Sequence, residues 1–183
     1  MSNPLLQTHA LPPFSDINAE HVLPAVEEHL NTNRTRISEL LGKFASGEAT
    51  PTWESLIEPM DEWHDELSKA WSPVGHLNGV LNSDELREAY NACLPLLSQY
   101  WTEFGQNEDL FKAYDALKNS PEFDMLSVPQ KTAINNALRD FRLSGIDLPA
   151  DKKARYAEIQ QQLSKLTSKF SENVLDATAA WTK

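Results

Sequence analysis

Residues 150–183 read ADKKARYAEIQQQLSKLTSKFSENVLDATAAWTK and contain neither glycine nor proline. Ala, Lys, Gln, Glu and Leu are frequent in this stretch, and all have high intrinsic helix propensity. The apolar side chains recur at spacings of three and four residues, which places them on one face of an α-helix. They are Tyr156, Ile159, Leu163, Leu166, Phe170, Val174 and Ala177. The stretch predicts a long helix that begins near Pro149 and is still helical at Lys183.

The same helical signature extends over most of the 183 residues. The chain has only six glycines, and the two-residue alternation typical of strands is almost absent. Proline loses no hydrogen bond in the first turn of a helix, so Pro24 is predicted to start a helix that Gly47 ends. A second helix is predicted from about residue 50, with a kink at Pro59 and a break after Pro73.

Three shorter patterns follow before the last helix. Asn82 with Glu85 three residues later predicts a capping box at the start of a helix that bends at Pro95. Further helices are predicted from about Asn107 and from about Pro129. The fold class is therefore all-α, with residues 1–17 as an extended, proline-containing arm over the helices and residues 18–183 as one helical domain.

Composition excludes several classes of function. The formal net charge is −11 and the sequence pI is about 4.8, which disfavours nucleic acid and anionic membranes as partners. No apolar run is long enough to span a bilayer, and the N-terminus does not resemble a signal peptide. We therefore expect a cytoplasmic protein. The lone Cys93 lies among apolar residues and is expected to be a buried, inert thiol.

The histidines do not form a metal-binding motif. His64 is followed by two carboxylates in the stretch WHDEL, and its helical neighbours place it at the edge of an apolar face, as a partly buried core residue. A zinc-protease helix carries two histidines four residues apart in H-E-x-x-H, and this sequence has no such pair. His76 lies beyond Pro73, in the predicted break. We therefore predict no catalytic, cofactor-binding or metal-ligating residue in this chain.

Four stretches carry a resemblance to a known family. They are NPLL at residues 3–6, HVLPAVEEHL at 21–30, SPVGHLNGVLNSDELREAY at 72–90 and NALRDFRLSGIDLPADKKARYAEIQQQLSKLTSKFSENVLDAT at 136–178. In this order they resemble the N-terminal part of the thimet oligopeptidase family of zinc metallopeptidases. The resemblance covers essentially the whole chain.

The resemblance implies a mostly helical peptidase that cuts short oligopeptides in a deep channel between two halves. In that family zinc is bound by the histidines of H-E-x-x-H and a later glutamate, all from a C-terminal catalytic domain that this sequence does not contain. The implied role of the chain is therefore one wall of the channel, catalytically inactive by itself, while the full-length parent holds the zinc. Such a chain is expected to self-associate or fray at its last helix. The alternative is a self-sufficient helical protein-interaction module.

Overall fold

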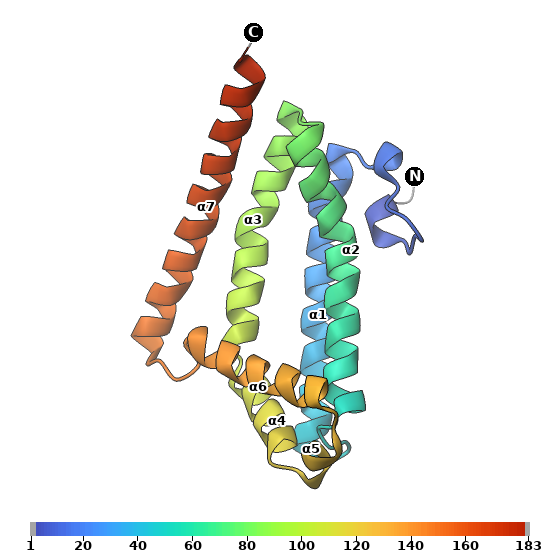
Figure 1. Ribbon diagram of the computed structural model, residues 1–183, viewed down its shortest axis with the longest axis vertical. Coiled ribbons are helices and arrows are strands. Elements are labelled where there is room, and N and C mark those ends of the chain that lie inside the picture. Colours follow the sequence, from blue (N-terminus) through green and yellow to red (C-terminus); the bar gives the residue numbers. More distant parts are fainter. Residues whose placement is uncertain (1–2, 182–183) are drawn as a thin grey trace. The chain divides into compact units, whose positions relative to one another are not determined.

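The computed structural model describes residues 3–181, and within that range the chain is helical with no strand (Figure 1). Seven α-helices account for most of the 82% helical content. The predicted all-α class is confirmed. The ends of the predicted arm and of the predicted last helix, residues 1–2 and 182–183, lie outside the described range.

Helix α1 covers Ala19–Ser46, and it begins earlier than predicted. The ring Nδ1 of His21 accepts a hydrogen bond from the Asn18 backbone N–H at 3.1 Å, which caps the helix five residues before Pro24. Pro24 therefore lies inside α1 and not in its first turn, so the predicted start is wrong. Gly47 ends the helix as predicted, with a positive φ of 75° that glycine adopts without strain.

The N-terminal arm contacts α1 through backbone and side-chain hydrogen bonds. It forms two 3₁₀ turns, Pro4–Leu6 and Phe14–Asp16. The Asn3 side chain donates to the His21 carbonyl at 2.8 Å, and His29 Nε2 lies 3.0 Å from the Leu5 carbonyl oxygen. The arm is thus attached to the helix that follows it in sequence.

Helix α2 covers Glu58–Val80 and follows a π-helical turn, Trp53–Ile57. The turn is capped by Thr52, and Pro59 is the second residue of α2, where the hydrogen bonding changes from π to α. The predicted break after Pro73 is wrong, because α2 continues through it and carries His76. A proline inside a helix costs about 3 kcal/mol. Burial of Ala70, Val74 and Leu77 on both sides of it offsets that loss.

Helix α3 covers Asp84–Gly105, with Pro95 inside it. Its N-cap is Ser83, whose Oγ accepts from the Leu86 N–H at 3.2 Å, so the predicted cap at Asn82 is wrong by one residue. Gly105 is required at the end of α3, because a Cβ there would lie 2.6 Å from the Cβ of Ser144.

Three helices follow α3. They are α4, Glu108–Lys118, α5, Pro121–Met125, and α6, Val128–Leu143. Helix α4 begins next to Asn107, close to the predicted start, with Asn107 as its N-cap, and α6 begins one residue before the predicted Pro129. The short α5 was not predicted. Helix α7 covers Ala150–Ala180, and it has no buried residue. Trp181 is not helical, so the prediction that the helix continues without a stop is wrong at that residue.

The described chain divides into two compact units, and helices α1, α2, α3 and α7 each contribute residues to both. The first comprises residues 3–30, 66–99 and 158–181, and the second comprises residues 31–65 and 100–157. The second unit has a contiguous core, whose members are Ile37, Leu56, Ile57, Met60, Leu110, Ala113, Tyr114, Leu117, Ile134, Leu138, Phe141 and Ile146. The first unit buries Val22, Val26, Leu30, Leu67, Val74, Leu86, Cys93 and Leu97. Whether residues 18–183 behave as one domain stays a prediction.

Leu67 tests the core of the first unit. The substitution Leu67→Ala should lower the free energy of unfolding by about 2–5 kcal/mol, because Leu67 is buried and the change leaves a cavity. Leu81 is 71% exposed, so Leu81→Ala is the matched control and should change stability by less than about 0.5 kcal/mol. Urea denaturation of both variants checks the difference. Equal losses would show that Leu67 is not a core residue.

Candidate functional site

His64 lies in an aromatic environment in the second unit. Its Nε2 is 3.1 Å from the hydroxyl of Tyr100, and its ring centroid lies 4.8 Å from that of Trp101 and 4.9 Å from that of Phe104. Burial lowers the pKa of His64 to about 4. The imidazole is therefore neutral at pH 7 and packs against the rings of Tyr100, Trp101 and Phe104. This confirms the prediction of a partly buried core histidine.

The remaining histidines have other partners. His76 is exposed on α2, where its ring lies 5.4 Å from that of Phe14. His9 and His29 each place Nε2 3.0 Å from a backbone carbonyl oxygen of the arm. In residues 3–181 no three His, Cys, Asp or Glu side chains converge in a way that could hold a metal ion. The described residues therefore do not fit a zinc site, and the absence of catalytic or cofactor-binding residues from this chain stays a prediction.

Cys93 is fully buried in the first unit, as predicted. Burial, with a smaller contribution from the charge of Glu27, raises the pKa of its thiol to about 12. The thiolate is the nucleophilic form of cysteine. At pH 7 this thiol is protonated and inaccessible, so it does not act as a nucleophile.

A groove of about 730 Å³ lies in the second unit between α1, α3 and α4. Its floor is apolar and includes Ile37, Leu41 and Phe104. The charged groups at its edge are paired, Arg34 with Glu103 at 2.8 Å and Lys112 with Asp109 at 2.9 Å. The groove therefore offers apolar surface to a ligand, with its edge charges already neutralised.

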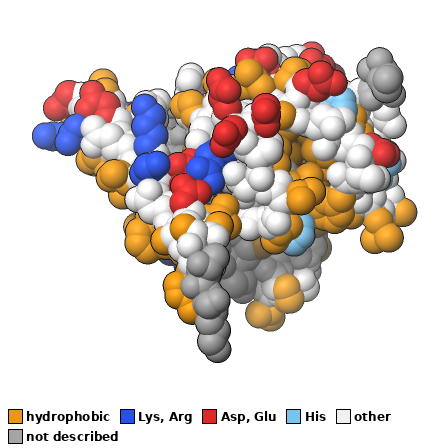
Figure 2. Space-filling model, turned by 90° about the horizontal axis from the view of Figure 1, so that it is seen from above, with side chains coloured by type: hydrophobic (Ala, Val, Ile, Leu, Met, Phe, Trp, Pro, Cys, Tyr) orange, Lys and Arg blue, Asp and Glu red, His pale blue; other side chains and the backbone are white. Residues whose placement is uncertain are grey.

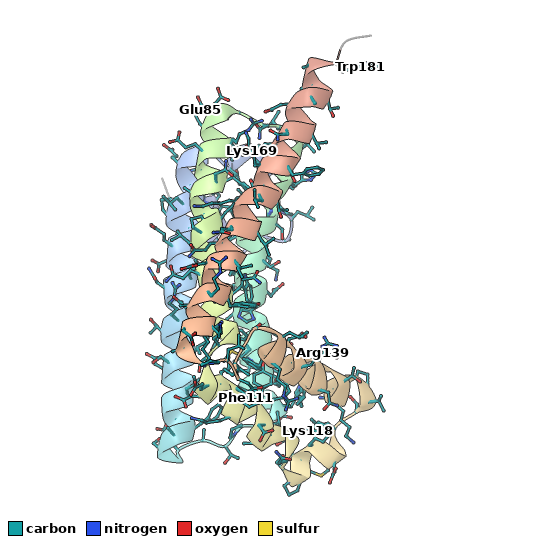
Figure 3. The ribbon with its side chains drawn as sticks, turned by 90° about the vertical axis from the view of Figure 1, so that its left-hand side faces the viewer. Glu85, Phe111, Lys118, Arg139, Lys169 and Trp181 are labelled. Carbon is teal, nitrogen blue, oxygen red and sulfur yellow. The ribbon has the colours of Figure 1, made fainter. Side chains whose placement is uncertain are left out.

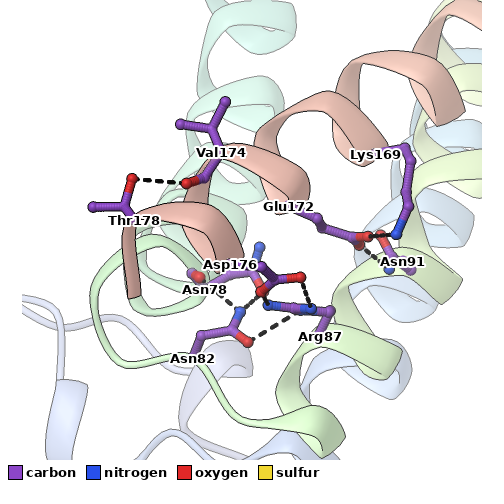
Figure 4. Close-up of polar contacts among 9 residues, drawn as sticks. All are labelled: Asn78, Asn82, Arg87, Asn91, Lys169, Glu172, Val174, Asp176 and Thr178. Carbon is purple, nitrogen blue, oxygen red and sulfur yellow. Dashed lines mark hydrogen bonds and ion pairs between the residues drawn. The ribbon is translucent and has the colours of Figure 1, made fainter. Parts of the chain in front are cut away.

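A polar seam joins α3 to α7 in the first unit, and Figure 4 shows its contacts. The Arg87 guanidinium donates to both carboxylate oxygens of Asp176, at 2.6 and 3.1 Å. One turn along each helix, Asn91 donates to Glu172 at 2.6 Å and accepts from Ser168 at 3.0 Å. Hydrogen bonds from Arg87 and Asn91 lower the pKa of Asp176 and Glu172, respectively. Both acids are therefore held in the charged form.

The seam determines which face of α7 is exposed. Ser168, Glu172 and Asp176 are four residues apart and share one face of the helix. At 100° per residue, the apolar side chains of α7 lie on the opposite face. Their exposed fractions are 39% for Ile159, 50% for Leu163, 68% for Leu166, 70% for Phe170 and 51% for Val174. The helix thus contacts its own unit through polar groups and leaves its apolar stripe uncovered.

The exposed stripe borders a groove of about 700 Å³ in the first unit, which Leu163, Phe170 and Val174 line from α7 and Tyr90 and Leu94 line from α3. Figure 3 shows α7 with its side chains projecting from the ribbon and Trp181 at its C-terminal end. The face of the molecule in Figure 2 likewise carries exposed hydrophobic side chains beside acidic ones. The exposed face of α7 and this groove are the strongest candidate for a binding surface in the described range.

One feature of the sequence relates to the seam, although the seam was not predicted from it. Ser164, Ser168, Glu172 and Asp176 form a polar stripe at four-residue spacing, opposite the apolar one. Such a stripe usually faces water. The pairing of this stripe with Arg87 and Asn91 depends on the position of α3, which the four-residue spacing in α7 does not reveal.

Comparison with known proteins identifies the family. The family model of the neurolysin/thimet oligopeptidase N-terminal domain matches residues 25–153, more than half of the chain. The chain belongs to this family. The resemblance noted from the sequence is thereby confirmed.

Relatives of the chain are named oligopeptidase A. The chain is 55% identical to oligopeptidase A of Haemophilus influenzae and 52% identical to that of Escherichia coli, in each case over its whole length and 26% of the relative. It is 35% identical to a probable cytosolic oligopeptidase A of Arabidopsis thaliana, of which it covers 25%. The chain thus spans about a quarter of the length of these relatives, at their N-terminal end.

Among residues 3–181, none of the helices combines the length and the apolar character that crossing a bilayer requires.

The pKa of His64 predicts a pH dependence of stability. The folded-state value of about 4 lies below the ordinary value of 6.5, so between these values the unfolded state binds a proton that the folded state excludes. The free energy of unfolding should fall by about 3 kcal/mol from pH 7 to pH 4 because of this group. The contribution of neutral His64 to stability is fully present above pH 6.5 and is lost as the pH falls toward 4. His64→Gln should flatten the profile by that amount in urea melts, whereas His76→Gln is the matched control. Parallel profiles for the two variants would contradict the assignment.

The seam predicts that Arg87 holds α7 in place. Arg87→Ala removes both hydrogen bonds to Asp176, so amide hydrogens of residues 164–180 should exchange faster. Lys112→Ala breaks the exposed Lys112–Asp109 pair in α4 and is the matched control, without effect on α7. Hydrogen exchange read by mass spectrometry distinguishes them. Unchanged exchange in Arg87→Ala would show that the seam does not hold the helix.

Proposed function

We propose that this chain forms the N-terminal helical domain of a larger, cytoplasmic zinc metalloendopeptidase that degrades short oligopeptides. One observation carries the proposal, the 50–55% identity over the full chain to the N-terminal quarter of proteins named oligopeptidase A. Identity at this level along an uninterrupted stretch supports the same domain in the same context. The substrates and the zinc are then properties of the longer polypeptide.

The chain alone is proposed to be catalytically inactive. Its 183 residues contain no H-E-x-x-H, the helical motif in which two histidines bind zinc and the glutamate acts as general base. Histidines in the described range make other contacts, His64 with the Tyr100 hydroxyl and His29 with the Leu5 carbonyl oxygen. The zinc ligands therefore belong to the C-terminal catalytic domain of the parent.

In the parent, the domain is proposed to form one wall of the substrate channel. The support is architectural, since the long helices bury an apolar core in each compact unit. A channel wall limits the size of what enters, so unfolded peptides pass and folded proteins do not. The apolar groove between α1, α3 and α4 is surface that such a wall could offer to peptide side chains.

A self-sufficient helical interaction module is the second candidate. The exposed apolar stripe of α7 favours it, because contiguous exposed apolar surface marks protein interaction sites. This candidate differs in one testable respect, since its function needs no following catalytic domain.

A domain replacement tests the proposed function. This chain is joined to the Haemophilus influenzae oligopeptidase A in place of the quarter that it matches, and cleavage of a quenched-fluorescent peptide is measured. The hybrid should cleave the peptide, whereas the purified chain should cleave none and retain no stoichiometric zinc after dialysis. The matching relative without its N-terminal quarter is the control. One zinc per isolated chain, lost on His64→Ala, would overturn the proposal.

A further inference from the structure

The apolar stripe of α7 is the largest unexplained feature of the first unit. Leu163, Leu166 and Phe170 are each at least half exposed, and Trp181 at the end of the described chain is 72% exposed. Uncovered apolar surface is unfavourable by about 25 cal/mol per Å². A stripe of this length, continuous over several helical turns, marks a surface that another structure covers.

We propose that this stripe is a docking surface. Its occupant is the polypeptide that, in the longer relatives, follows the N-terminal quarter matched by this chain. The inference rests on the proposed function and adds the contact by which the two parts join. The chain covers 26% of the Haemophilus influenzae relative, at its N-terminal end, so about three quarters of such a protein follows α7. The helix that precedes that polypeptide directly is the one whose apolar face is uncovered.

Tethering favours this occupant over a separate protein. A segment joined to the end of α7 encounters the stripe at the high effective concentration of an intramolecular contact. The stripe also extends toward that junction, because Phe170, Val174 and Trp181 continue it to the end of the described residues. The occupant is therefore an apolar face of the following polypeptide, with side chains that enter the groove between α7 and α3.

The polar seam orients the docking surface. The bidentate Arg87–Asp176 pair and the Asn91–Glu172 hydrogen bond fix the rotation of α7 about its axis. With that rotation fixed, the stripe lies on the side of α7 opposite the seam residues Glu172 and Asp176 and borders the groove that α7 shares with α3. If α7 instead turned its apolar face inward, the two carboxylates would lose their partners in the seam. The seam therefore keeps the docking surface available, and Arg87 is a positioning residue.

The test compares the isolated chain with the hybrid that carries the remainder of the Haemophilus influenzae relative. Hydrogen exchange of residues 159–177 should be slower in the hybrid by on the order of 100-fold, because docking covers the helix. The double substitution Leu166→Asp with Phe170→Asp should abolish that protection. Leu81→Asp is the matched control, since Leu81 is equally exposed but lies outside α7, and it should leave the protection unchanged.

The outcomes separate this inference from the proposed function. A hybrid that cleaves peptides while α7 exchanges as fast as in the isolated chain would overturn the docking surface and leave the function standing. Light scattering distinguishes a second copy as occupant. A hybrid that dimerises, and becomes monomeric with the Leu166→Asp and Phe170→Asp substitutions, would show that α7 pairs with α7 and overturn the inference. An isolated chain that is strictly monomeric, with residues 165–181 already protected, would also overturn it.

Discussion

The structure depends on one constraint, that the apolar face of each long helix must be covered. Helices α1, α2, α3, α4 and α6 satisfy it, because residues such as Val26, Leu67 and Ile134 are almost fully buried. Helix α7 does not, because it uses its polar face for the contact with α3.

Polar contacts suit the α3–α7 contact because they are directional. Apolar packing tolerates rotation and sliding of a helix, whereas a bidentate guanidinium–carboxylate pair fixes both. The pair between Arg87 and Asp176 is partly exposed, so it contributes little to stability. Its role is geometric, since it sets which face of α7 is exposed. A helix held in this way is fixed in orientation and only weakly bound.

In the second unit, by contrast, the polar residue His64 is partly buried and uncharged. His64 is surrounded by Tyr100, Trp101 and Phe104, and burial removes its charge at neutral pH. Its hydrogen bond to the Tyr100 hydroxyl satisfies the ring in an otherwise apolar setting. Nearby, the buried Asn33 donates to the Trp63 carbonyl oxygen and connects α1 to α2. A histidine beside carboxylates in the sequence is thus a core residue in the fold.

The sequence by itself determined the helical class, the start of α4 near Asn107, the stop at Gly47 and the apolar stripe of α7, because each depends on residues within a few positions of one another. It misplaced the start of α1, the cap of α3 and the end of α2. There the local signals of Pro24, Asn82 and Pro73 were overridden, the first by a histidine cap and the last by burial on both sides. Only the tertiary structure decided that Arg87 and Asn91 pair with Asp176 and Glu172, since residues more than eighty positions apart meet only after folding. That pairing turns the stripe of α7 outward, which no periodicity could have revealed.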